Sequence, residues 1–401
     1  MGNLNHPEKK LASSRIQVVD ALRGFAVIAI LLVHSVEHFI YPVYPDVENQ
    51  AAWLTILDKS TFTLTFGLFA GKAYAIFALL FGFTFHIQFS NQQKKGLDFG
   101  WRFIWRLVLL SLFATLNAAF FPGGDVLLLF VFVGGFLVLV RHWTDKSILI
   151  LSIILLLQPV EWFHFIMSLT TSDYSLPNLG IGPLYGKVIG IAKTGEWLPF
   201  LKANLWTGQK ASLFWAIGSG RFLQTAGLFL LGLYIGRKEF FISSKENINF
   251  WVKTLIVAAI VFAPLYMFKV QWYDESSTPI IKRTVGVVFD MWQKLAFTFI
   301  LVASFVLVWQ NKKFQKRSKN LTYYGKMSLT NYISQSLIGA LIFFPIGLNL
   351  APYTGYTLSL LIGFVIYFFQ VRFCKWWLSR NSHGPLEYIW KKATWIGATK
   401  R

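Results

Sequence analysis

The first long apolar stretch of the chain carries ionisable residues at helical spacing. In "VVDALRGFAVIAILLVHSVEHF", Arg23 and His34 are eleven residues apart, so a helix places both on one face, about 16 Å apart along its axis. A guanidinium in this position can hold phosphates or a carboxylate, and a neutral imidazole away from water can act as a general base. The pair would suit a long substrate with a phosphorylated head and a reactive tail, and acyl-coenzyme A has that shape.

The same residues allow two other interpretations. Asp20 lies one turn before Arg23, so these two can pair at the membrane interface while His34 forms a hydrogen bond within the bundle. "HSVEH", from His34 to His38, also matches the H-x-x-E-H signature of inverted zinc proteases, which would place two ligands and a glutamate base on one face. No convincing third ligand lies in a defined partner motif, so we expect no metal here.

Polar residues outside this stretch add further candidates. Arg102 and Arg106 lie one turn apart and could extend a phosphate site or bind lipid head groups. Asp125 in "PGGD" could cap a helix, and Asn117 is expected at the same outer level, where its amide could stabilise an oxyanion. Asp290 and Lys294 have the spacing of a structural i,i+4 pair.

The elements that position these residues are apolar segments long enough to cross a bilayer. The chain has 401 residues, of which 55% are hydrophobic and only 14% are charged, and a soluble protein of this length could not bury so much apolar surface. We therefore predict an all-α, polytopic transmembrane bundle of about ten helices forming one domain over residues 1–401. The expected spans are Val18–Ile40, Phe62–Phe89, Phe103–Phe121, Val126–Val140, Ile148–Leu169, Ala211–Gly236, Phe250–Phe268, Val285–Trp309, Met327–Leu350 and Tyr353–Phe373.

The distribution of positive charge predicts the orientation. The net charge is +20, and Lys and Arg gather in short loops on one side of the predicted spans, which indicates membrane topology rather than nucleic-acid binding. Both termini are then cytoplasmic, with a cytoplasmic segment at 1–15, an extracytoplasmic loop at 170–210 and an amphipathic, interfacial tail at 375–401. The bilayer is the first expected partner, and a second copy of the chain, forming a homodimer, is a candidate.

Several segments together resemble the YeiB-like family of bacterial membrane proteins, a domain of unknown function, over nearly the whole chain. They are "RIQVVDALRGFAVIAILLVH", "AIFALLFGFTF", "RLVLLSLFATLNAAFFPGGDVLLLF", "GRFLQTAGLFLLGLYIGR", "GKMSLTNYISQSL" and "HGPLEYIWKKATW". That family is similar to the transmembrane acyltransferases, which include heparan-α-glucosaminide N-acetyltransferase and the bacterial polysaccharide O-acetylases. In the O-acetylases an arginine, ten residues and a histidine occupy the first helix, a pattern that Arg23 and His34 match. Many YeiB-like members would carry Asn where His34 stands, so this chain departs toward the acetylases.

The resemblance implies an acyltransferase in the plasma membrane of a bacterium, with acyl-coenzyme A as donor and no metal. Arg23, Arg102 and Arg106 would hold the donor, His34 would be the base, and Asn117 or Asp125 would assist at the outer end. The acceptor would be a hydroxyl or amine at or beyond the outer face. A transporter or lipid flippase is the alternative, because it also needs intramembrane charges around a central cavity. An intramembrane metalloenzyme using His34 and His38 is a second alternative.

Overall fold

Every regular element is a helix in the described part of the chain, which a computed structural model covers at residues 16–40, 50–123, 125–275 and 278–397. The helices of the first half are α1 (Gln17–Val36), α2 (Ala52–Phe69), α3 (Lys72–Gln93), α4 (Gly100–Phe120), α5 (Val126–Val140), α6 (Asp145–Leu156), α7 (Pro159–Thr170), α8 (Ile181–Ala192), α9 (Trp197–Ala203) and the π-helical turn η1 (Asn204–Gly208). Those of the second half are α10 (Gln209–Gly218), α11 (Arg221–Arg237), α12 (Lys245–Glu275), α13 (Pro279–Thr284), η2 (Val285–Phe289), α14 (Asp290–Val308), α15 (Lys312–Arg317), α16 (Lys319–Lys326), α17 (Ser328–Phe343), η3 (Ala351–Tyr353), α18 (Tyr356–Leu378) and α19 (Pro385–Thr394).

Six stretches of helix in the described residues are long and apolar enough to cross a membrane, and eight if two bent pairs each count as one span. The chain is therefore a multi-pass membrane protein by the length and composition of its helices. The count of about ten spans stays a prediction. α5 begins and ends at the predicted residues, but its 15 residues are short for a span.

Three of the predicted spans are interrupted. The second predicted span covers parts of two successive helices, α2 and α3. They are separated at Gly71, which takes a left-handed conformation (φ 77°). The fifth bends by 47° between α6 and α7, where Pro159 starts the new helix. The sixth bends by 75° between α10 and α11, where Gly220 has φ 67°. The apolar runs are correctly placed, and the breaks occur at residues that favour new helix starts.

The segment predicted as an extracytoplasmic loop at 170–210 contains helical structure. It holds α8, α9 and η1, and α8 is an apolar helix of 12 residues. The predicted tail contains the end of α18 and the separate helix α19. The predicted N-terminal segment 1–15 and the last four residues of the tail lie outside the described residues.

Glycines bring four helices into backbone contact. A Cβ added to Gly24 of α1 would lie 2.0 Å from the Leu321 carbonyl oxygen of α16. At the crossing of α3 and α11, a Cβ on Gly82 would lie 1.9 Å from the Phe229 oxygen, and one on Gly232 would lie 1.9 Å from the Leu79 oxygen. Small residues let helix backbones approach this closely. Close packing matters in a membrane because the hydrophobic effect does not drive helices together there.

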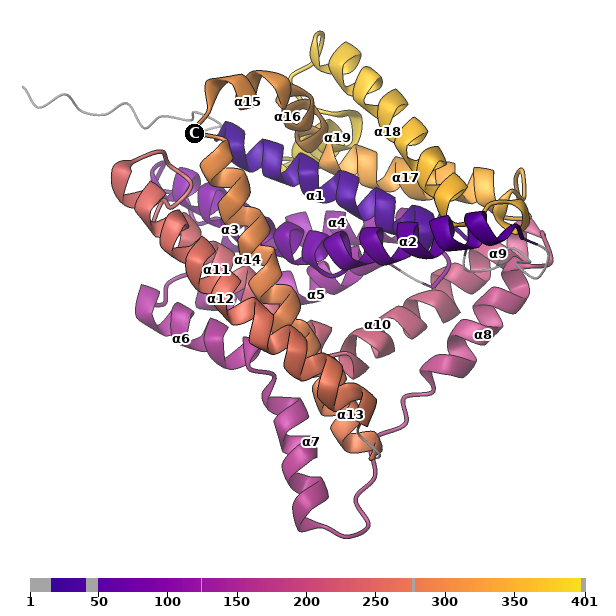
Figure 1. Ribbon diagram of the computed structural model, residues 1–401. Coiled ribbons are helices and arrows are strands. Elements are labelled where there is room, and N and C mark those ends of the chain that lie inside the picture. Colours follow the sequence, from indigo (N-terminus) through magenta and orange to yellow (C-terminus); the bar gives the residue numbers. More distant parts are fainter. Residues whose placement is uncertain (1–15, 41–49, 124, 276–277, 398–401) are drawn as a thin grey trace, which may run out of the picture.

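The start of α1, the basic helices α15 and α16, and α19 lie at one end of the molecule (Figure 1). The two ends of the described chain are therefore close together. We call this end the basic end. The cytoplasmic orientation itself stays a prediction from the positive residues. At the periphery, α12 exposes large apolar side chains such as Ile260 and Met267, as a helix facing lipid does.

Candidate functional site

The basic end of the molecule contains a cavity of about 1020 Å³. Its walls come from α1, α3, α4, α17 and α19, so they unite the first helix with the C-terminal one. Aromatic side chains of α3 and α4 line much of it, and polar and cationic residues of the helix ends surround the rest. Deep apolar pockets with a few fixed polar groups are typical of ligand sites.

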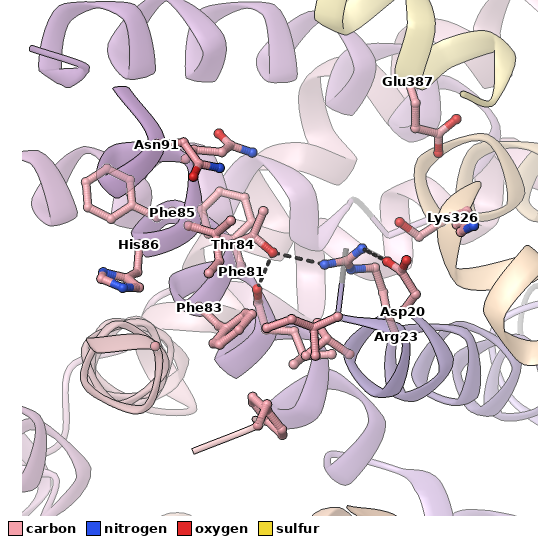
Figure 2. Close-up of a pocket in the computed structure, with 18 of the residues that line it drawn as sticks. Asp20, Arg23, Phe81, Phe83, Thr84, Phe85, His86, Asn91, Lys326 and Glu387 are labelled. Carbon is pink, nitrogen blue, oxygen red and sulfur yellow. Dashed lines mark hydrogen bonds and ion pairs between the residues drawn. The ribbon is translucent and has the colours of Figure 1, made fainter. Parts of the chain in front are cut away.

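Arg23 lines this cavity and is held in place from two sides (Figure 2). Its Nη1 lies 3.2 Å from the Asp20 carboxylate, and its Nη2 donates to the Thr84 hydroxyl of α3 at 3.0 Å. The Arg23 side chain remains 18% exposed, whereas Asp20 is only 4% exposed. The pairing with Asp20 therefore exists, and it positions a guanidinium that a ligand in the cavity can still contact.

The two arginines of α4 have different environments. Arg106 lines the cavity, with its guanidinium 3.5 Å from the centre of the Trp390 ring of α19. Arg102 instead donates to the carbonyl oxygens of Thr394 and Ile396 at 3.1 and 3.0 Å, and it does not line the cavity. Arg106 therefore lines the cavity together with Arg23, whereas Arg102 binds the C-terminal segment.

Helix α19 covers one side of the cavity and is fixed by a half-buried carboxylate. Glu387 accepts hydrogen bonds from the backbone N–H groups of Leu329 and Thr330, at 2.7 and 3.1 Å, and from the Thr330 hydroxyl at 2.6 Å. Burial raises the pKa of Glu387. Trp390 adds a hydrogen bond of 3.0 Å to the Arg106 carbonyl. The tail is therefore a wall of the site and not only an interfacial helix.

Among the α17 residues that line the cavity, Tyr332 lies farthest along the helix from the basic end. It is one of the lining residues, and its hydroxyl donates to Asp125 Oδ1 at 3.0 Å. Asp125 is 1% exposed and Asn117 is fully buried, and neither lines the cavity. Asp125 stands at the N-cap of α5, and its side chain accepts the hydrogen bond of the Tyr332 hydroxyl.

Asn117 holds unused hydrogen-bonding capacity beside this pair. Its amide lies next to the Asp125 carboxyl, but neither of its polar atoms meets hydrogen-bond geometry with any described group. Asp125 Oδ2 is in the same state. Buried polar atoms are nearly always paired, so unpaired ones point to a ligand or a water.

His34 lies beyond Tyr332 and outside the cavity lining. Its ring centre is 6.3 Å from that of Tyr332, 4.7 Å from that of Phe121 and 5.1 Å from that of His38. Its Nδ1 has no partner among the described groups, and the residue retains some exposed surface. Arg23 and Tyr332 therefore line the cavity and His34 does not, although Tyr332 brings the cavity wall next to His34.

Several residues of this arrangement gave no signal in the sequence. Tyr332 and Thr84 are uncharged, and Glu387 and Trp390 belong to a tail predicted to lie at the interface. The polar neighbours of Tyr332 form hydrogen bonds within the bundle. Asn331 donates to the Tyr324 carbonyl at 3.0 Å, and Gln335 donates to the Tyr324 hydroxyl at 2.8 Å.

The described residues contain no group of three His, Cys, Asp or Glu side chains that could hold a metal ion. The predicted pair of Asp290 and Lys294 is present, at 2.6 Å, and Lys269 joins it. Asp290 and Lys294 lie at the start of α14 and Lys269 lies in α12, and none of the three lines the cavity.

Comparison with known proteins gives relatives without an assigned activity. Residues 235–397 match the profile of a family described as "Protein of unknown function (DUF418)". The chain is 26% identical to "Uncharacterized protein YxaH" of Bacillus subtilis, with 96% of each chain covered, and 25% identical to "Uncharacterized protein YeiB" of Escherichia coli, with 94% of this chain and 95% of the relative covered. A 39.9 kDa protein from the amylase 3′ region of Bacillus acidopullulyticus is 26% identical over 95% of this chain. No solved structure matches.

Proposed function

We propose that this chain is a YeiB-like acyltransferase of the bacterial plasma membrane, which moves an acyl group from cytoplasmic acyl-coenzyme A to a hydroxyl or amine at the outer face. The observation that carries the proposal is the position of Tyr332. This residue ends a cavity containing two arginines, donates to the buried Asp125 and contacts the ring of His34. Donor and acceptor would meet at that point from opposite sides.

The cavity suits a donor with a charged head and an apolar arm. Arg23 and Arg106 supply fixed guanidinium groups for phosphates, and Lys326 and Lys391 add cationic lining at the same end. The aromatic walls of α3 and α4 suit the pantetheine arm and acyl group. The thioester would then lie against Tyr332, at the deep end of the cavity.

Each group near Tyr332 would have a role in the transfer step. The acceptor oxygen or nitrogen attacks the thioester carbonyl carbon while His34 accepts its proton. A carbon–oxygen or carbon–nitrogen bond forms, the carbon–sulfur bond breaks, and the coenzyme A thiolate leaves toward the cytoplasm, where it is protonated by water. The amide of Asn117, beside Asp125, would donate to the oxyanion that develops during attack. Tyr332 and Asp125 would position the reacting groups.

Donor binding distinguishes an acyltransferase from a transporter or flippase, because a transporter or flippase has no reason to bind acyl-coenzyme A. Inverted membrane vesicles expose the cytoplasmic face, so acyl-labelled acetyl-coenzyme A can be added directly to it. We predict that vesicles with the wild-type chain transfer label to envelope material. His34→Ala should abolish the transfer but leave coenzyme A binding to the purified protein unchanged.

His164→Ala is the matched control, because His164 binds Tyr174 in the segment after α7, remote from the cavity. It should transfer label at the wild-type rate. Undiminished transfer by His34→Ala, or failure of the wild-type protein to bind coenzyme A, would refute the proposal.

A further inference from the structure

A second group of charged residues lies away from the cavity, where α3, α11 and α14 begin. Lys72 begins α3, Arg221 begins α11, and Asp290 and Lys294 lie at the start of α14, with Lys269 of α12 beside them. We call these five residues the outer cluster. None of them lines the cavity, which reaches the other ends of α3 and α11.

The outer cluster is brought together by two parallel helices. Contacts between α3 and α11 join Tyr74 to Thr225, Gly82 to Phe229 and His86 to Gly236, so residue numbers rise together along both helices. Their N-termini therefore lie at one end, and each start exposes backbone N–H groups and the positive end of the helix dipole.

The cationic heads are close to one another. A Cβ built on Gly71 would lie 2.9 Å from Lys294 Cδ and 3.7 Å from Arg221 Nη2, so both side chains pass the start of α3 within a few ångströms of this glycine. Glycine at this position leaves the room that the two heads occupy. Lys294 also lies within electrostatic range of Lys269 and of Glu37 at the end of α1.

Positive charge exceeds negative charge in this group. Asp290 is shared by two lysines, Lys269 at 2.5 Å and Lys294 at 2.6 Å. The partners of the other two cations are neutral: Lys72 donates to the Gly67 carbonyl at 2.6 Å, and Arg221 donates to Gln224 at 2.6 Å. Among the described residues, four cations thus face only two carboxylates, those of Asp290 and Glu37.

An excess of positive charge is energetically costly at the place where these residues lie. Lys72 is 3% exposed in the middle of an apolar stretch at Ala52–Gln93, and Lys294 lies within the candidate span at Pro279–Val308. Ionisable groups within a membrane are expensive and normally mark a ligand or ion pathway. The side chains of Lys294 and Lys269 remain 20% and 29% exposed, so a ligand can reach the cluster.

We propose that the outer cluster is a binding site for a phosphate group presented from the outer side of the membrane, recognised by Lys72, Arg221 and Lys294 at the N-termini of α3 and α11. The net excess of two positive charges matches a phosphate better than a single carboxylate, and helix N-termini favour tetrahedral oxyanions. The phosphate belongs to a lipid head group or to a soluble phosphate ester. This site does not depend on acyl transfer and is separate from the cavity.

Phosphate binding is measured on the purified full chain in detergent, in an Arg23→Gln, Arg106→Gln background that removes the cavity arginines. Inorganic phosphate should bind saturably and raise the Tm. Lys72→Gln and Arg221→Gln should each weaken binding about tenfold or more, as expected for loss of a charge-assisted hydrogen bond. Arg221→Lys should lose less, because it keeps the charge. Lys202→Gln, an exposed lysine of α9, is the matched control and should bind normally.

The source of the phosphate is tested in nanodiscs of phosphatidylcholine, either mixed with phosphatidylglycerol or supplied with glycerol 3-phosphate. Retention of phosphatidylglycerol in native mass spectra, lost in Arg221→Gln, identifies a lipid, whereas binding of glycerol 3-phosphate alone identifies a soluble ester. Absence of saturable binding to the parent, or equal affinity in a folded Arg221→Gln variant, would overturn the proposal. If Lys72→Gln does not fold, the two Arg221 variants still test whether the outer cluster binds phosphate.

Discussion

Arg23 and His34 show what helical phase can and cannot predict about single residues. Their spacing placed both on one face of the first helix, and both do face the interior of the bundle. The phase of one helix says nothing about what a neighbouring helix inserts between two of its side chains. α17 inserts Tyr332 there, so Arg23 lines the cavity and His34 lies beyond it. Arg102 shows the same limit, because its partners come from a tail nearly three hundred residues later.

The role given to Tyr332 leads to a prediction at the residue scale. Tyr332→Phe removes the donor to Asp125 and leaves a buried carboxylate oxygen without its partner, at a cost of about 1–3 kcal/mol in the free energy of unfolding. We expect acyl transfer to fall at least tenfold, while coenzyme A affinity is unchanged because the arginines are intact.

Tyr324→Phe is the matched control for that variant. Tyr324 is also a buried tyrosine, and it donates to Gln370 and accepts from Gln335 away from the cavity. It should lose comparable stability and keep its transfer rate. Equal transfer rates for the two variants would remove Tyr332 from the account.

At the scale of elements, apolar runs predicted where helices lie better than where they break. α5 matches its predicted bounds because Asp125 and Arg141 stop the apolar run at both ends. The breaks at Gly71, Pro159 and Gly220 depend on local conformations that hydropathy does not report. The Gly and Pro residues were visible in the sequence, but such residues also occur inside continuous membrane helices, so they did not by themselves identify the breaks.

The crossing of α3 and α11 supports both the cavity and the outer cluster, and it can be tested directly. Gly232→Ala would place a methyl group 1.9 Å from the Leu79 carbonyl oxygen, so the two helices must separate. Overpacking of this kind costs about 1–3 kcal/mol. We expect a lower Tm and a smaller free energy of unfolding in mild detergent, measured by denaturant titration.

Gly135→Ala in α5 provides the comparison, since a Cβ there would meet nothing within 4 Å. Alanine also has the better helix propensity, so this variant should be as stable as the wild type or slightly more stable. Equal stability of both variants would show that the α3–α11 crossing is looser than described.

Across the whole molecule, the two polar regions lie apart within one helix bundle. The cavity at the basic end combines guanidinium groups, aromatic walls and the cover formed by α19. The outer cluster lies at the far ends of α3, α11 and α14. The predicted orientation gives the cavity to the cytoplasm and the cluster to the outside. The sequence indicated the class of protein and the first-helix residues, but the cavity depends on contacts among α1, α3, α4, α17 and α19 that no local pattern encodes.

The central claim is that the cavity receives acyl-coenzyme A with its phosphates at Arg23 and Arg106 and its thioester against Tyr332. The most direct measurement is a density map of the purified protein incubated with acetyl-coenzyme A. The account predicts continuous density that begins beside the two arginines and ends at the Tyr332 ring. Density for lipid chains filling the cavity, or coenzyme A bound elsewhere with the cavity empty, would contradict it.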